Sequence, residues 1–184
     1  MIWVFITAGC APEAATESTS YLSINLEEYH QLSDFKSWTY RDDMPESAED
    51  FPDEARLMLA QNEAGIVSFR RGSRWIEAST VGQMEWSLDD GLVLESWNLP
   101  MGSGNGPIVL SDADPEAGDV ITEGDWTCEL SQPDTMWTWY AEYDFVLYFD
   151  CDSSAQAFDI FFAKQAGLIH FQTENYELDL VAPW

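Results

Sequence analysis

The fold is indicated most strongly by the stretch QMEWSLDDGLVLESWN, which occupies residues 83–98. Two short runs rich in β-branched and aromatic residues flank Asp89-Asp90-Gly91 in this stretch, as expected of two strands. An Asp-Gly pair tolerates the positive φ that tight turns require. The sequence therefore predicts a β-hairpin here.

Similar runs occupy most of the chain, and no segment of ten or more residues has a clear helical period. The glycine-rich stretch 100–107 and the acidic stretches 42–54 and 112–119 are predicted loops. We therefore expect an all-β fold, a single antiparallel sheet of about ten strands curled into a half-barrel or barrel. Besides the hairpin, the predicted strands are 21–26, 35–41, 55–64, 66–70, 74–79, 126–131, 135–143, 145–151, 157–164, 168–172 and 176–181.

The chain opens with nine mostly apolar residues that end in Thr7-Ala8-Gly9, followed by Cys10. This pattern resembles the end of a bacterial lipoprotein signal peptide, in which the cysteine is lipidated. On this interpretation, residues 1–9 are a signal-peptide remnant, residues 10–20 are the lipidated Cys10 and a flexible acidic tether, and residues 21–184 are the β-domain. The alternative is an N-terminal strand carrying a buried free cysteine.

The charge of the chain excludes one class of partner. There are 34 acidic and 7 basic residues, a formal net charge of -27. Such a surface repels phosphate backbones, so we expect no nucleic-acid partner. The carboxylates are interpreted as a solvated coat that depends on salt screening, and the alternative is capture of cations or of a basic partner.

Cys128 and Cys151 are an even pair once Cys10 is assigned to the lipid. An oxidising compartment favours joining two such thiols, so the sequence predicts a disulfide between them. The alternative is a catalytic thiol, which would need a nearby histidine.

A candidate metal site lies in the acidic loop. Asp112, Asp114, Glu116 and Glu123 take the first, third, fifth and twelfth places of a calcium-loop spacing. However, Pro115 interrupts the loop and no helices are predicted on either side. The alternative is a solvated acidic loop without an ion, which we favour.

Tryptophans provide a candidate ligand-binding surface. Trp137 and Trp139 fall in one predicted strand, where alternate residues share a face. Exposed, they would stack on sugar rings or line an apolar cavity, and buried they would be core residues. We expect most strand tryptophans to belong to the core.

Four segments, 37–41, 90–94, 162–169 and 176–180, include a Trp-x-Tyr opening strand and a closing hairpin of the Gly-Leu-Val type. Together they resemble a group of bacterial cell-envelope lipoproteins that share these features. The resemblance implies an envelope location, periplasmic or surface-exposed, and an antiparallel sheet similar to the half-barrels of periplasmic lipoprotein carriers. It supplies no catalytic residue.

These observations lead to one expected function and two alternatives. We expect a non-enzymatic protein, attached to the membrane by its N-terminal lipid, whose β-domain binds a protein partner or an apolar ligand. No catalytic motif is found and no cofactor is expected. The alternatives are a carbohydrate-binding module that uses the strand tryptophans and a carboxylate-based hydrolase.

Overall fold

The computed structural model describes residues 24–29, 37–43, 57–63, 65–71, 79–99, 102–133, 135–138, 141–174 and 176–183. Cys10, the tether and Trp139 lie outside these ranges. The described residues form one short helix, α1 (Leu26–Tyr29), and fourteen strands. The strands are β1 (Ser37–Asp43), β2 (Leu57–Glu63), β3 (Ile66–Arg71), β4 (Ser79–Ser87), β5 (Gly91–Leu99), β6 (Gly102–Asp112), β7 (Val120–Glu123), β8 (Trp126–Ser131), β9 (Thr135–Trp137), β10 (Glu142–Asp144), β11 (Val146–Ser153), β12 (Ala157–Ala163), β13 (Gly167–Thr173) and β14 (Tyr176–Pro183).

Twelve of these strands form one antiparallel sheet in the order β6-β5-β4-β3-β2-β1-β14-β13-β12-β11-β8-β7. A separate two-stranded sheet contains β9 and β10. The predicted all-β, antiparallel class is confirmed. The prediction of a single sheet is wrong, and so is the closed barrel, because the strand order of the large sheet is open, ending at β6 and β7.

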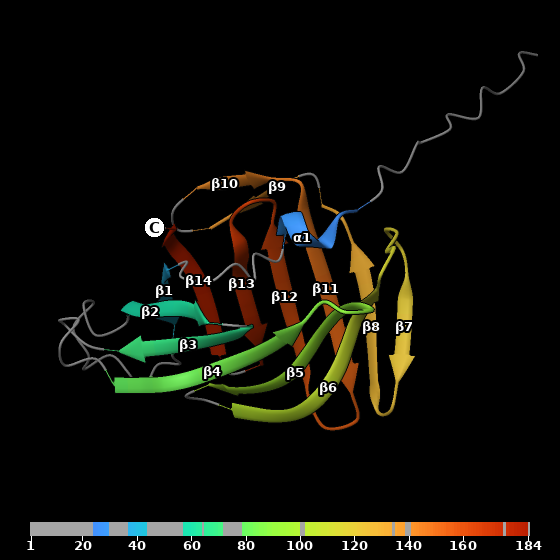
Figure 1. The fold of residues 1–184 in the computed structure, drawn as a ribbon, viewed down its shortest axis with the longest axis horizontal. Helices are drawn as coiled ribbons and strands as arrows, with labels where there is room; N and C mark the ends of the chain where they lie inside the picture. Colours follow the sequence, from blue (N-terminus) through green and yellow to red (C-terminus); the bar gives the residue numbers. More distant parts are fainter. Residues whose placement is uncertain are drawn as a thin grey trace, which may run out of the picture.

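The large sheet folds over so that its two halves face each other (Figure 1). One half contains β2 to β6, and the other contains β14 to β11 with β8 and β7. Aromatic side chains bridge the halves: Trp86 of β4 contacts Phe162 of β12 at 5.5 Å, and Trp97 of β5 contacts Phe171 of β13 at 5.8 Å, between ring centroids. All four side chains are buried. The core therefore lies between the two halves.

The predicted hairpin at residues 83–98 is confirmed, because β4 and β5 pair with each other on either side of a turn at Asp89 and Asp90. Gly91 adopts a φ of 134°, and a Cβ atom there would lie 2.0 Å from the carbonyl oxygen of Ser111. Only glycine combines this backbone conformation with this close approach of β6.

The prediction of a loop at 100–107 is wrong, because β6 begins at Gly102. The glycines make room for neighbouring groups instead of forming a turn. A Cβ atom on Gly104 would lie 2.2 Å from Nε1 of Trp97, and one on Gly106 would lie 2.5 Å from the carbonyl oxygens of Leu94 and Glu95. Glycine inside a strand often marks such a close approach.

Two further predictions need correction. Residues 24–26 are not a strand, because the chain enters α1 after Asn25, whose Oδ1 accepts a hydrogen bond from the Glu27 amide at 3.1 Å. This is the capping interaction that starts helices. The segment 135–143 is a hairpin and not one strand, since β9 and β10 pair through Trp137 and Glu142.

Helix α1 packs against the turn between β12 and β13. Leu26 and Tyr29 are buried in the core, the Gln165 amide donates to the Glu28 carbonyl at 2.7 Å, and Lys164 forms an ion pair with Glu28. The helix thus anchors the start of the described chain to the half of the sheet that contains β13.

Candidate functional site

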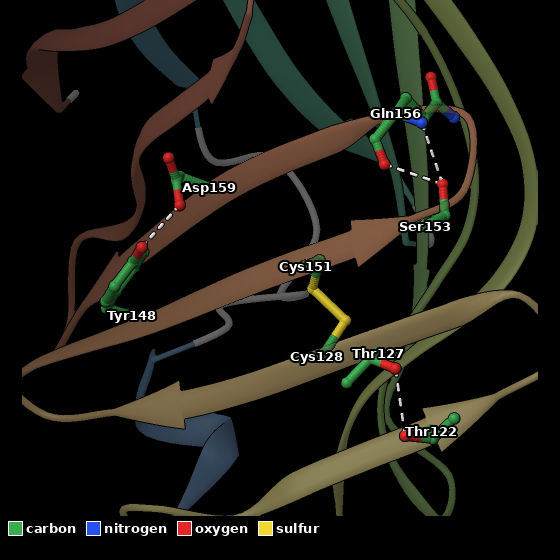
Figure 2. Close-up of a disulfide and its surroundings, with 8 residues drawn as sticks. All are labelled: Thr122, Thr127, Cys128, Tyr148, Cys151, Ser153, Gln156 and Asp159. Carbon is green, nitrogen blue, oxygen red and sulfur yellow. Dashed lines mark hydrogen bonds between the residues drawn. A yellow bond between two sulfur atoms is a disulfide. The ribbon is translucent and has the colours of Figure 1, made fainter.

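The predicted disulfide between Cys128 and Cys151 is present (Figure 2). The two residues lie directly opposite each other on β8 and β11, with their Cα atoms 4.1 Å apart. This spacing is close to the roughly 4.5 Å between Cα atoms of a directly opposed, non-hydrogen-bonded pair in antiparallel strands, and both residues are buried. The bond ties β8 to β11 and leaves neither thiol available as a nucleophile.

The acidic loop connects β6 to β7, the two edge strands of the large sheet. Asp112 ends β6 and Glu123 ends β7, and the Glu116 amide donates to Oδ2 of Asp119 at 2.7 Å. Asp112, Asp114, Glu116 and Glu123 are all exposed. They are not among the groups of three potential ligands that converge in the described part of the chain.

The tryptophans divide between the core and the surface. Trp86 and Trp97 are buried, so the expectation of core tryptophans is confirmed for these two. Trp126 is partly buried against the core and packs on Phe158 at a centroid distance of 4.9 Å. Trp137 is different, because it is 70% exposed on β9. Phe145, which follows β10, is 64% exposed. These two are the most exposed large hydrophobic side chains among the described residues.

A polar cluster that the sequence patterns do not predict lies on β13 and β14. His170 is opposite Asp179, and Gln172 is opposite Glu177. Nδ1 of His170 lies 2.6 Å from Oδ1 of Asp179 and 3.9 Å from Oε1 of Glu177. His170 and Asp179 are buried, whereas the Glu177 side chain is 39% exposed.

This cluster lies on the face of the sheet opposite to the core. The neighbouring residues Phe171 and Leu178, which alternate with the cluster, are buried in the core. Phe161 of β12 packs edge-on against the His170 ring, with centroids 5.2 Å apart and planes at 82°. Nε2 of His170 lies 3.5 Å from Oε1 of Gln172. The imidazole is therefore held in position by groups from three adjacent strands.

The carboxylates beside His170 raise its affinity for a proton. Burial lowers the pKa of His170, but the hydrogen bond to Asp179 and the charges of Asp179 and Glu177 outweigh burial, so the pKa lies above that of a free imidazole. An imidazole in this setting can hold a proton or serve as a ligand to a cation. Its second nitrogen faces an amide and not a hydroxyl, which does not fit a nucleophile-activating pair.

The same face continues across β12 and β11. Tyr148 stacks on Phe161 at a centroid distance of 4.4 Å and donates to Oδ1 of Asp159 at 2.7 Å (Figure 2). Burial, followed by this hydrogen bond, raises the pKa of Tyr148, so the phenol remains a neutral donor. Burial and the charges of Asp159, Asp152 and Glu129 raise the pKa of Asp150.

The cluster could have been found from the sequence by aligning the last hairpin. Strands predicted at 168–172 and 176–181, joined by a tight turn at 174–175, place His170 opposite Asp179. The alternation His170, Gln172 and Glu177, Asp179 then puts four polar side chains on one face. A three-residue turn at 173–175 would instead pair His170 with Leu178, so the cluster depends on the exact register.

No helix of the described residues is long and apolar enough to cross a membrane. The chain matches no protein-family model, no curated protein and no solved structure.

Proposed function

We propose that this chain is a non-enzymatic, lipid-anchored protein of the bacterial cell envelope whose β-domain binds a protein partner through its outer surface. The observation that carries the binding role is the exposure of Trp137, at 70%, and of Phe145, at 64%, at the β9–β10 hairpin and the turn that follows it. Aromatic side chains are enriched at the centres of protein interfaces, where they bury large areas.

The filled interior favours a surface partner over an internal apolar ligand. A half-barrel similar to that of periplasmic lipoprotein carriers would offer its ligand an open concave face. Here the Trp86–Phe162 and Trp97–Phe171 contacts occupy the space between the two halves of the sheet. An apolar ligand would have to displace buried aromatic side chains, which supports binding on the outside.

The envelope location is supported by the buried Cys128–Cys151 disulfide, because such bonds persist in oxidising compartments outside the cytosol. The lipid anchor rests on Thr7-Ala8-Gly9-Cys10. With a full-length signal peptide in front of the chain, Cys10→Ser should move the protein from the membrane fraction to the soluble periplasmic fraction. Retention of the variant in the membrane fraction would contradict the anchor.

The partner is tested by placing a photo-crosslinking phenylalanine analogue at position 137 or 145 in living cells. Both positions should give the same discrete protein adduct, whereas the exposed position Gln83, on β4, should give none. In a second arm, Trp137→Ala should abolish the adduct formed from position 145. Adducts that are equally frequent at position 83 would overturn the proposed interface.

A carbohydrate-binding module is the second candidate, since an exposed indole also stacks on sugar rings. It is distinguished by fluorescence: an oligosaccharide ligand should change the emission of the wild type and not that of Trp137→Ala. A saturable change, together with the absence of protein adducts at positions 137 and 145, would favour sugar over a protein partner.

A further inference from the structure

We propose that His170, Asp179 and Glu177 form a binding site for a divalent transition-metal ion on the outer face of the last hairpin. One nitrogen and two carboxylate oxygens, one from each residue, lie within 4.8 Å of one another. This is the one such group of three among the described residues. The site goes beyond the proposed partner binding and does not depend on it.

Strand register assembles the three ligands. His170 and Asp179 are direct partners on β13 and β14, and Glu177 is two residues from Asp179 on the same strand. Alternate residues of a strand share a face, so Asp179 and Glu177 both project to the side of the sheet that carries His170. Two adjacent strands of a regular sheet therefore hold all three groups without any loop.

Two of the three ligand side chains are buried, and the third is partly exposed to solvent. The side chains of His170 and Asp179 are 6% and 11% exposed, and that of Glu177 is 39% exposed. Ionised groups are seldom buried to this degree unless they are paired or coordinate a metal. An ion entering beside Glu177 would reach two buried ligands.

The distances suit a small metal ion. Ligand bonds of about 2.0–2.2 Å in a tetrahedral arrangement put neighbouring ligand atoms roughly 3.3 Å apart. The observed separations from Nδ1 of His170, 2.6 Å to Asp179 and 3.9 Å to Glu177, lie on either side of this value. Shifts below about 1 Å in two carboxylates would therefore complete the site.

The surroundings of His170 resemble those of metal-bound histidines. Such a ligand commonly directs its second ring nitrogen toward an oxygen, which fixes the tautomer and the ring orientation. Here Nε2 lies 3.5 Å from Oε1 of Gln172, and Phe161 packs edge-on against the ring. Nδ1 is thereby directed at the carboxylates.

The ligand set selects the class of ion. Imidazole suits zinc, iron, nickel and copper, whereas calcium and magnesium prefer oxygen ligands alone. One imidazole and two carboxylates match a zinc-type ion whose fourth position is taken by water.

The site is tested with cobalt, whose visible absorption bands report direct coordination. The full chain, free of affinity tags and stripped with a chelator, is titrated with Co²⁺ in about 0.5 M sodium chloride to screen the acidic surface. We expect one equivalent to bind with visible bands, which one equivalent of Zn²⁺ removes and excess Mg²⁺ or Ca²⁺ does not.

Two variants separate this site from the acidic coat. Glu177→Gln keeps the His170–Asp179 hydrogen bond and should weaken Co²⁺ binding at least ~10-fold with an unchanged circular dichroism spectrum. Glu174→Gln, an exposed position in the same hairpin, should leave binding unchanged. Absence of visible bands in the wild type, or an equal effect of Glu177→Gln and Glu174→Gln, would overturn the assignment.

Discussion

Replacement of Gly104 by alanine should destabilise the fold through a single contact. Gly104 lies opposite Trp97 in the β5–β6 register, and its φ is ordinary, so alanine meets no backbone strain. The added Cβ atom would lie 2.2 Å from Nε1 and 2.7 Å from Cε2 of the indole. Since ordinary contacts begin near 3.4 Å, the ring must move by about 1 Å.

The indole has no open space to move into. Trp97 is only 5% exposed and packs against Phe171 on the other half of the sheet. Overfilling a packed core typically costs about 1–3 kcal/mol. For a domain of this size, 2 kcal/mol corresponds to a fall in melting temperature of about 4–8 °C. Thermal and urea unfolding followed by circular dichroism would measure both quantities.

A double-mutant cycle isolates the contact. Trp97→Leu removes the ring and should cost about 2–4 kcal/mol alone. In that background, Gly104→Ala should cost less than about 0.5 kcal/mol, giving a coupling energy of at least ~1 kcal/mol. Ser103→Ala, at the exposed neighbouring position, is the matched control. Additive effects, or a wild-type stability for Gly104→Ala, would refute the explanation of this glycine as space for Trp97.

Three further predictions concern the disulfide and the carboxylates. Alkylation under denaturing conditions without reductant should leave Cys128 and Cys151 unlabelled, and labelling of either residue in freshly isolated protein would reject the bond. Replacement of both cysteines by alanine should lower the free energy of unfolding by about 3 kcal/mol. Because the pKa of Asp150 is raised, the folded state binds the proton of this carboxyl more tightly than the unfolded state does. The protonated carboxyl therefore contributes its full stabilisation below the pKa of the unfolded state. That stabilisation is lost as the pH rises through the pKa of the folded state. Asp150→Asn should therefore raise the melting temperature at pH 7 and lose this advantage near pH 4, and an advantage that grows on acidification would contradict the cause. Added sodium chloride should raise the melting temperature smoothly, and about 1 mM calcium in about 0.5 M sodium chloride should not raise it further. A calcium-specific rise in melting temperature that Asp112→Ala with Asp114→Ala abolishes would make the 112–123 loop a binding site.

The elements that the sequence predicts correctly are those that depend on local chemistry. The Asp89-Asp90-Gly91 turn needs a positive φ, which Gly91 supplies. The disulfide needs only an even pair of cysteines in strands that come together, and Cys128 and Cys151 prove to be direct neighbours. The turn signal is contained in three adjacent residues, and the disulfide signal is contained in the number of cysteines, so neither prediction requires the strand register.

The wrong predictions concern segments whose conformation or register depends on residues that are distant in the sequence. Gly104 and Gly106 look like parts of a loop, and only the positions of Trp97 and of the β5 carbonyls explain them as parts of a strand. The His170–Asp179 cluster likewise depends on the exact register of β13 and β14, which a shift of one residue would destroy. The predicted strands 168–172 and 176–181 fit more than one turn length, so the strand pattern alone does not select the observed register.

The position of β14 in the middle of the large sheet has a consequence for synthesis and export. The strand closest to the C-terminus joins β1, the earliest strand described, to β13. Until residues 176–183 have emerged, β1 and β13 each present an unpaired edge, and such edges attract other chains. Pairings between residues this distant in sequence also form slowly, because a long loop must close first. A chain released before residue 176 should therefore aggregate and depend on holding chaperones, whereas the complete chain closes both edges with one strand.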